Sequence, residues 1–264
     1  MNLDLKDKVV VVTGPAKGMG AAITLGFAQE GAKLALLGRD THAIEPVARQ
    51  ACELGVETVV FSCDVTDSRA VEHTIEAVLN RFDNRIDVLV NVAGGTGPIG
   101  KTGAETTADE FDDIVRLNMG GPFNLIRAVA PVMKRLGGGK IINIGGTFGM
   151  RGRAMRLAYS SSKWGLRGLT KSFAIELGPH NINVNLVAPG MVDGPRFREK
   201  VVPQVAEQYG ISLDDAARQH ASDYALGRIS TDHDVASATL FLASDCARQI
   251  TGVDLPVDGG WAAL

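Results

Sequence analysis

Short runs of aliphatic residues recur along the chain, separated by longer stretches whose apolar positions have a helical spacing. The runs are apolar throughout rather than alternating with polar residues, which is typical of strands covered on both faces. They predict strands at residues 9–13, 33–37, 58–62, 88–92, 140–144, 183–187 and 253–257. With right-handed crossovers, this order predicts a single α/β domain over residues 1–264, a doubly wound, Rossmann-like parallel sheet of seven strands with helices on both faces.

Two of the expected helices carry start signals. Thr107 followed by Glu110 has the pattern of a capping box, and Asp67 precedes a stretch of apolar positions at helical spacing. Residues 195–224 depart from the alternation, because this polar, helical-looking stretch is long for a connection in a compact domain. We expect it to form a substrate lid, and an excursion without a functional role is the alternative.

Composition narrows the class of partner. The 264-residue chain has a formal net charge of −3 and no long run of basic residues, which argues against nucleic acid and anionic membrane surfaces as partners. Its N-terminus lacks the apolar core of a signal peptide, and no apolar run is long enough to span a bilayer, so we expect a cytoplasmic protein. The three cysteines and five histidines lack ligand spacing, so we expect no metal site. A small molecule is therefore the expected partner.

A glycine-rich turn follows the first expected strand and precedes an apolar helix. It contains Gly14, Lys17, Gly18, Met19 and Gly20, with the spacing G-x-x-x-G-x-G. Glycines let the backbone approach a pyrophosphate, whose charge then faces the amides at the helix N-terminus. The strand, turn and helix together predict a dinucleotide site.

Tyr159 and Lys163 lie four residues apart at the start of an apolar helix, so their side chains share one face. A free phenol titrates near about 10, and a nearby cation favours the phenolate and lowers that value. Taken alone, this spacing is more often that of an exposed helical pair. Its place after the fifth expected strand of a dinucleotide fold predicts instead that Tyr159 gives a proton to a carbonyl oxygen, or removes one from an alcohol.

These two motifs resemble those of the short-chain dehydrogenase/reductase family, and the resemblance continues along the entire chain. The TGxxxGxG turn of the family matches Thr13 through Gly20, and its YxxxK pair matches Tyr159 and Lys163. Asp64 and Val65 match the family's adenine-contacting position, and Asn91, Ala93 and Gly94 match its NNAG element, in which Val92 replaces the second Asn. Asn118 falls where the family has its catalytic-site Asn. Pro189 and Gly190, with nearby Val192, match the turn at the nicotinamide, and Asp258-Gly259-Gly260 matches the usual C-terminal ending.

The resemblance implies an NAD(P)-dependent oxidoreductase that interconverts a carbonyl and an alcohol on a small or medium-sized substrate. It also implies that Lys163 binds the nicotinamide ribose, that Asn118 holds a water in the proton path, and that the protein is a homotetramer or a homodimer.

The end of the second expected strand bears on the choice of cofactor. Gly38 stands where NAD-preferring relatives place an Asp, and Arg39 follows it, with Lys17 in the glycine turn. Because NADP carries an extra phosphate on the adenosine ribose, these cations favour NADP. Asp40 is the next residue, and it leaves NAD possible.

One position departs from the family pattern. The Ser that usually lies thirteen residues before the Tyr is replaced by Gly146, so a hydroxyl that polarises the carbonyl is missing. Thr147 is the nearest candidate replacement; Ser160 or Ser161, a lid residue or the substrate itself are the alternatives. The Thr expected after the Pro-Gly turn is also replaced, by Gly194. If nothing replaces the Ser, the protein would be a catalytically weak dinucleotide-binding sensor or scaffold.

The substrate end of the site is less defined. Arginines between the fifth strand and the catalytic helix, or at the start of the lid, are candidates to receive a carboxylate or another anion, and solvated or subunit-contact roles are the alternative. They are Arg151, Arg153, Arg156, Arg196 and Arg198. Phe148, Trp164 and Met191 are candidates to shape an apolar pocket, with core packing as the alternative.

Overall fold

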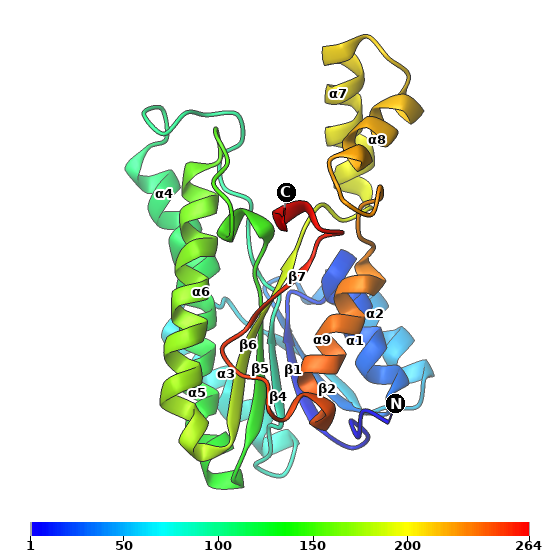
Figure 1. Cartoon of the computed structure of the whole chain (residues 1–264). Coiled ribbons are helices and arrows are strands. Elements are labelled where there is room, and N and C mark those ends of the chain that lie inside the picture. Colours follow the sequence, from blue (N-terminus) through cyan, green and yellow to red (C-terminus); the bar gives the residue numbers. More distant parts are fainter. Residues whose placement is uncertain (1, 264) are drawn as a thin grey trace.

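The computed structural model describes residues 2–263, and within them a seven-stranded parallel sheet lies between two layers of helices (Figure 1). The strand order is β3-β2-β1-β4-β5-β6-β7, and every neighbouring pair is parallel. The strands are β1 (Val9–Thr13), β2 (Lys33–Gly38), β3 (Thr58–Ser62), β4 (Val88–Asn91), β5 (Gly139–Ile144), β6 (Ile182–Pro189) and β7 (Asp254–Val257). The expected fold class is confirmed.

The apolar strands are explained by two cores, one on each face of the sheet. Val9 and Val11 of β1 point into one core, whereas Val10 and Val12 point into the other. The first core is covered by α3 (Ser68–Arg81), α5 (Gly121–Leu136) and α6 (Leu157–Leu177), and the second by α1 (Gly18–Gln29), α2 (Thr41–Glu53) and α9 (Asp232–Ala243). A strand buried on both faces has no solvent-facing side, so it needs no polar alternation.

Both predicted helix starts are present. The Thr107 hydroxyl accepts a hydrogen bond from the backbone N–H of Glu110, whose carboxylate accepts one from the Thr107 N–H, at the start of α4 (Ala108–Val115). Asp67 caps α3 by accepting hydrogen bonds from the N–H groups of Arg69 and Ala70. The described helices include none with the length and apolar character needed to cross a bilayer.

The stretch 195–224 folds into a π-helical turn (Phe197–Val201), α7 (Val202–Tyr209) and α8 (Leu213–Ser222). Figure 1 shows α7 and α8 standing beyond the carboxyl ends of the strands, apart from the two main helical layers. A small apolar cluster of its own, built on Phe197, Val202 and Ala216, holds these helices together. The segment is therefore placed over the end of the sheet where sites of this fold lie.

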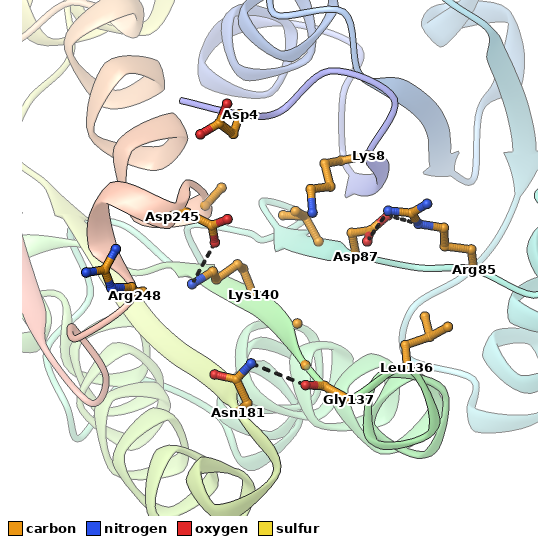
Figure 2. Close-up of a pocket in the computed structure, with 14 residues that line it drawn as sticks. Asp4, Lys8, Arg85, Asp87, Leu136, Gly137, Lys140, Asn181, Asp245 and Arg248 are labelled. Carbon is orange, nitrogen blue, oxygen red and sulfur yellow. Dashed lines mark hydrogen bonds and ion pairs between the residues drawn. The ribbon is translucent and has the colours of Figure 1, made fainter. Parts of the chain in front are cut away.

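A polar cavity lies at the opposite end of the sheet, where the strands begin (Figure 2). Lys140 donates a hydrogen bond to Asn183 (2.8 Å) and lies 3.8 Å from the carboxylate of Asp245. Arg85 forms a bidentate pair with Asp87, at 2.7 and 3.0 Å. These pairings give four of the cavity's charged groups structural partners, and the cavity contains none of the candidate site residues.

Candidate active site

Two glycines of the turn after β1, Gly14 and Gly20, have no room for a side chain. Gly14 and Gly18 have φ of +64° and +56°, in the left-handed region that favours glycine. A β-carbon on Gly14 would lie 2.9 Å from the Cα of Ala93, and one on Gly20 would lie 2.1 Å from the carbonyl oxygen of Gly14. In the described structure, Lys17 precedes α1 without a side-chain cap, so the first amides of the helix remain available to an anion. The turn fits a pyrophosphate.

The loop after β4 is fixed beside this turn. The Thr13 hydroxyl accepts hydrogen bonds from the N–H groups of Val92 and Ala93, both at 3.0 Å. Asn91 at the end of β4 donates to the buried Asn143 of β5 (2.8 Å). The predicted cofactor residues 91–94 thus lie at the carboxyl ends of the central strands, next to the glycine turn. Met19 is half-buried at the start of α1.

Asp64 has a fixed orientation at the end of β3. Its Oδ1 accepts hydrogen bonds from the backbone N–H (2.9 Å) and the hydroxyl (2.8 Å) of Thr66. These bonds, assisted by the charge of Arg39, lower the pKa of Asp64. Val65 is buried against Gly121, where an added β-carbon would lie only 2.8 Å from it. An ionised acceptor at this position suits the exocyclic amine of an adenine.

The end of β2 has little room for an acidic side chain directed at a ribose. A β-carbon on Gly38 would lie 2.8 Å from Cδ1 of Ile44. Asp40 accepts a hydrogen bond from the N–H of Ala43 (3.1 Å) as the cap of α2. Arg39 lies between them and is exposed.

Tyr159 and Lys163 come together in the first turns of α6, as their spacing predicts. Lys163 is only 7% exposed, and its Nζ donates a hydrogen bond to the carbonyl oxygen of Ile144 (3.0 Å). The same Nζ lies 5.7 Å from the centroid of the Tyr159 ring. Burial lowers the pKa of Lys163 from 10.5 to about 8.

Two arginines set the electrostatic environment of the Tyr159 phenol. Burial raises the pKa of Tyr159, whereas the charges of Arg156 and Arg196 act in the opposite direction. The guanidinium carbon of Arg156 lies 4.8 Å from the centroid of the phenol ring. The sequence offered both arginines only as candidates for binding the substrate.

Asn118 lies in a π-helical turn (Arg116–Gly120) between α4 and α5, a feature frequent at functional sites. Its side chain accepts a hydrogen bond from the N–H of Gly95 (2.8 Å) and donates to the Gly95 carbonyl (3.1 Å) and the Ser162 hydroxyl (2.9 Å). The buried amide therefore connects the loop after β4 with α6, around Lys163.

Position 146 faces the phenol oxygen. A β-carbon on Gly146 would lie 3.0 Å from Oη of Tyr159. Gly146 itself is extended, with φ 163° and ψ 151°, and consecutive side chains of an extended chain leave it on opposite sides. This geometry argues against Thr147, which is buried at the start of the turn Thr147–Gly149, as the replacement for the missing hydroxyl.

Ser160 and Ser161 lie on the flank of α6. They line an open, largely apolar groove together with Leu157 and Trp164. Tyr159 and Lys163 are not among the residues of this groove, so its hydroxyls belong to a different surface from the phenol. Trp164, a candidate for the substrate pocket, is 48% exposed there.

The Pro-Gly turn closes the site from the side of β7. The Gly190 N–H donates to the carbonyl oxygen of Val257 (3.0 Å), and a β-carbon on Gly190 would lie 2.9 Å from Cβ of Asp258. Pro189 is the last residue of β6, and Val192 forms a short parallel bridge with Ser230. The predicted residues 189–192 thus reach the same end of the sheet as Tyr159.

The C-terminal turn (Trp261–Ala263) contributes an aromatic residue that sequence reasoning missed. Phe148 packs edge-on against Tyr159, with ring centroids 6.2 Å apart, and its other neighbour is Trp261 at 5.6 Å. The Arg151 guanidinium lies 5.1 Å from the Trp261 ring. No sequence motif connects Trp261 with residues so distant along the chain.

The remaining substrate candidates separate into different environments. Arg198 forms a bidentate ion pair with Asp193 at 2.7 and 2.8 Å, and Arg153 and Arg196 are exposed. Met191 packs against the apolar cluster of the lid segment. Arg156 is 9% exposed and is the buried cation beside the phenol.

Comparison with known proteins agrees with this arrangement. A family model described as enoyl-(acyl carrier protein) reductase matches residues 14–262. The chain is 35% identical to a 3-oxoacyl-[acyl-carrier-protein] reductase of Thermotoga maritima, over 97% of this chain and 98% of that protein. NAD+-bound xylitol dehydrogenase superimposes with a TM-score of 0.90 at 32% identity, covering 97% of this chain and 100% of the other. Actinorhodin polyketide ketoreductase with NADPH gives 0.89 at 30% identity, with 98% of each chain covered.

Proposed function

Since the chain belongs to the short-chain dehydrogenase/reductase family, an NAD(P)-dependent family of alcohol and carbonyl oxidoreductases, we propose that Tyr159 is the acid/base of that reaction here. The observation that carries the proposal is the phenol at the carboxyl ends of the strands, 5.7 Å from the buried ammonium of Lys163. A bound nicotinamide dinucleotide would supply or accept the hydride.

The protein's own groups orient the substrate and move the proton. Tyr159 donates its phenolic proton to the carbonyl oxygen during reduction and takes the proton of the alcohol during oxidation. Lys163 binds the nicotinamide ribose, and Asn118 fixes the loop beside it and anchors the water of the proton path. The phenol is half-buried, and the lower polarity of its surroundings strengthens each of these electrostatic interactions.

NADP is the proposed cofactor, with NAD as the alternative. Arg39 is exposed at the end of β2, where the extra ribose phosphate of NADP would lie, and Lys17 precedes α1. Ile44 occupies the space that an acidic side chain at position 38 would need, and the Asp40 carboxylate caps α2. No carboxylate is therefore directed toward that phosphate by residues 38–40.

The segment 195–224 is proposed to act as a substrate lid. It extends beyond the carboxyl ends of the strands and packs mainly on its own apolar cluster, so it can move without disturbing either core of the sheet. Limited proteolysis with and without cofactor tests this proposal. Cleavage within 195–224 that slows when NADPH is added supports it, and an unchanged rate contradicts it.

A homotetramer or homodimer is proposed on the strength of exposed apolar side chains along α5 and α6. Phe123, Leu157, Trp164 and Ile175 are 45%, 46%, 48% and 80% exposed. Light scattering coupled to size exclusion tests the proposal at micromolar concentration, where a monomer would contradict it.

A dinucleotide-binding sensor is the second candidate function, because position 146 lacks a hydroxyl directed at the phenol. Tyr159→Phe separates the two. In the enzyme, this variant abolishes turnover of a panel of ketones and alcohols but leaves NADPH binding, followed by its fluorescence, nearly unchanged. Wild-type binding without turnover of any panel member favours the sensor. Unchanged turnover in the variant contradicts the assignment of Tyr159.

A further inference from the structure

We propose that Arg156 binds a carboxylate of the substrate, so that the enzyme acts on short oxo acids and hydroxy acids. The inference rests on the proposed oxidoreductase function and names the substrate class of that same site.

Arg156 is buried with an unused donor. Its side chain is 9% exposed, and Nη1 is buried with no hydrogen-bond partner among residues 2–263. A guanidinium carries five N–H donors in a rigid plane, and a buried donor without a partner is costly. The structure therefore contains an unsatisfied donor beside the reacting group.

The charge of Arg156 also lacks a partner in the described part of the chain. No carboxylate among residues 2–263 forms an ion pair with it, and the charged group with the largest effect on its pKa, Arg196, is itself positive. Burial and Arg196 together lower the pKa of Arg156. A buried, uncompensated cation is strongly destabilising, and an anion from outside the chain would relieve it.

The position of Arg156 at the start of a helix is also unfavourable for a positive charge. It is the N-cap of α6, whose first turn contains no acidic residue within the described structure, so the guanidinium faces the positive end of the helix dipole. Met155, directly before it, has φ of +58°, a strained conformation for a long side chain. Packing alone does not explain a buried cation that follows a strained residue, whereas an anion would interact favourably with both the guanidinium and the helix amides.

Distance then limits the size of the substrate. The guanidinium carbon lies 4.8 Å from the centroid of the ring whose oxygen exchanges the proton. In a 2-oxo or 3-oxo acid the carboxylate lies only one or two carbons from the carbonyl, so a short acid of this kind can contact the guanidinium and the phenol together. This geometry favours 2-oxo and 3-oxo acids, and the planar fork of arginine matches a carboxylate.

The first test compares each acid with its uncharged isostere. The kcat/KM values of acetoacetate against acetoacetamide, and of 2-oxobutanoate against 2-oxobutanamide, are measured with NADPH and with NADH. A charge-assisted hydrogen bond predicts a preference of at least about tenfold for one of the acids. In Arg156→Met this preference falls below about threefold, and in Arg156→Lys part of it returns. The charge of Arg156 also affects the pKa of Tyr159, so a substitution at Arg156 can change every rate. The ratio of kcat/KM for an acid to that for its amide is therefore compared, rather than either rate alone.

Arg248→Gln is the matched control, because it removes an exposed positive charge at the opposite end of the sheet. It should leave the preference at the wild-type value. A wild-type preference below about tenfold for both acids, or one that survives in Arg156→Met, overturns the proposal.

The second test needs no turnover. Malonate, inorganic phosphate and malonamide are titrated into the wild-type protein, and binding is followed by calorimetry. Malonate should bind more tightly than the other two and lose at least about tenfold in affinity in Arg156→Met but not in Arg248→Gln. Tighter binding of phosphate overturns the choice of a carboxylate. Malonate binding without turnover of any carbonyl would contradict the oxidoreductase function but support the anion site at Arg156. Equal turnover of acids and amides without malonate binding would support the oxidoreductase function but contradict the anion site.

The stability of Arg156→Met separates this role from a structural one. Removing an uncompensated buried charge should leave the melting temperature of the ligand-free protein equal to or above that of the wild type. A lower melting temperature would mean that Arg156 serves packing, and it would contradict the argument from the missing counter-charge.

Discussion

The β-carbon that Gly146 lacks would lie 3.0 Å from the phenol oxygen of Tyr159. The position is therefore aimed at the reacting atoms, although it carries no hydroxyl. Its extended backbone is open to any residue, so the only obstacle to a side chain is contact with the phenol, which must shift by a few tenths of an ångström.

Gly146→Ser should restore a donor to the substrate oxygen. Gly146→Ala introduces the same crowding without the hydroxyl and is the matched control. Since a single oxyanion donor contributes about 10²–10³ in kcat, the Ser variant should exceed the Ala variant by about 10²-fold on an uncharged ketone. Equal rates in the two variants would show that another group already fills this role.

Thr147→Val should lower kcat/KM by less than about threefold, because Thr147 follows an extended residue and its side chain leaves the chain on the side opposite to position 146. Valine keeps the volume and branching of the buried threonine and removes only the hydroxyl. A steady-state assay with one ketone and saturating NADPH is sufficient. A loss of tenfold or more would restore Thr147 as the replacement donor.

Local patterns in the sequence were sufficient for most of the fold. Residues 9–12 are all valine because their side chains point alternately into the two cores, so the apolar run was enough to predict a strand. The capping box at Thr107 was predictable because it involves residues only three positions apart. The pairing of Tyr159 with Lys163 was predictable for the same reason, since both lie on one face of one helix. Strand β6 ends two residues later than predicted, because its pairing with β7 continues to Pro189, opposite Val257.

The substrate end could not be predicted in the same way. The sequence presented five arginines near the site, and only the folded chain distinguishes the buried Arg156 from Arg198, which is paired with Asp193. Trp261 reaches Phe148 through the return of the C-terminal turn over the sheet, a contact that no local spacing encodes. Which arginine lacks a counter-charge therefore depends on burial and tertiary contacts, which no sequence motif encodes.

Arg39→Ala tests the proposed choice of cofactor. Losing one exposed cation near the ribose phosphate should raise the Kd of NADPH about tenfold and that of NADH less than about twofold, as measured by fluorescence titration. Arg49→Ala removes an exposed charge from α2 and should change neither value. An equal loss for both cofactors in Arg39→Ala would contradict the preference for NADP.

Gly38→Asp combined with Ile44→Ala should reverse that preference. Ile44 blocks a β-carbon at position 38 with its Cδ1 at 2.8 Å, so truncating Ile44 makes room for a carboxylate directed at the ribose. The carboxylate repels the phosphate of NADPH and accepts hydrogen bonds from the hydroxyls of NADH. The ratio of the two Kd values should shift toward NADH relative to Ile44→Ala alone, and an unchanged ratio would mean that this end of β2 does not contact the ribose.

Lys163→Met should stabilise the protein without cofactor while abolishing turnover. Burial lowers the pKa of Lys163 from 10.5 to about 8, so the charged form is disfavoured in the folded state. Below about pH 8 the full cost is present, about 3 kcal/mol for that shift; it decreases as pH rises toward 10.5, where the lysine becomes neutral in the unfolded chain as well. Loss of the hydrogen bond to Ile144 offsets about 1 kcal/mol, which leaves a net gain of about 2 kcal/mol at pH 7.

Urea denaturation of both proteins between pH 7 and pH 10 measures this difference, which should stay constant up to about pH 8 and shrink from there to pH 10. Lys134→Met, a change at an exposed lysine of α5, should show no such trend. A difference for Lys163→Met that stays constant with pH, or a destabilised variant at pH 7, would contradict the assignment of a buried, desolvated ammonium at the centre of the site.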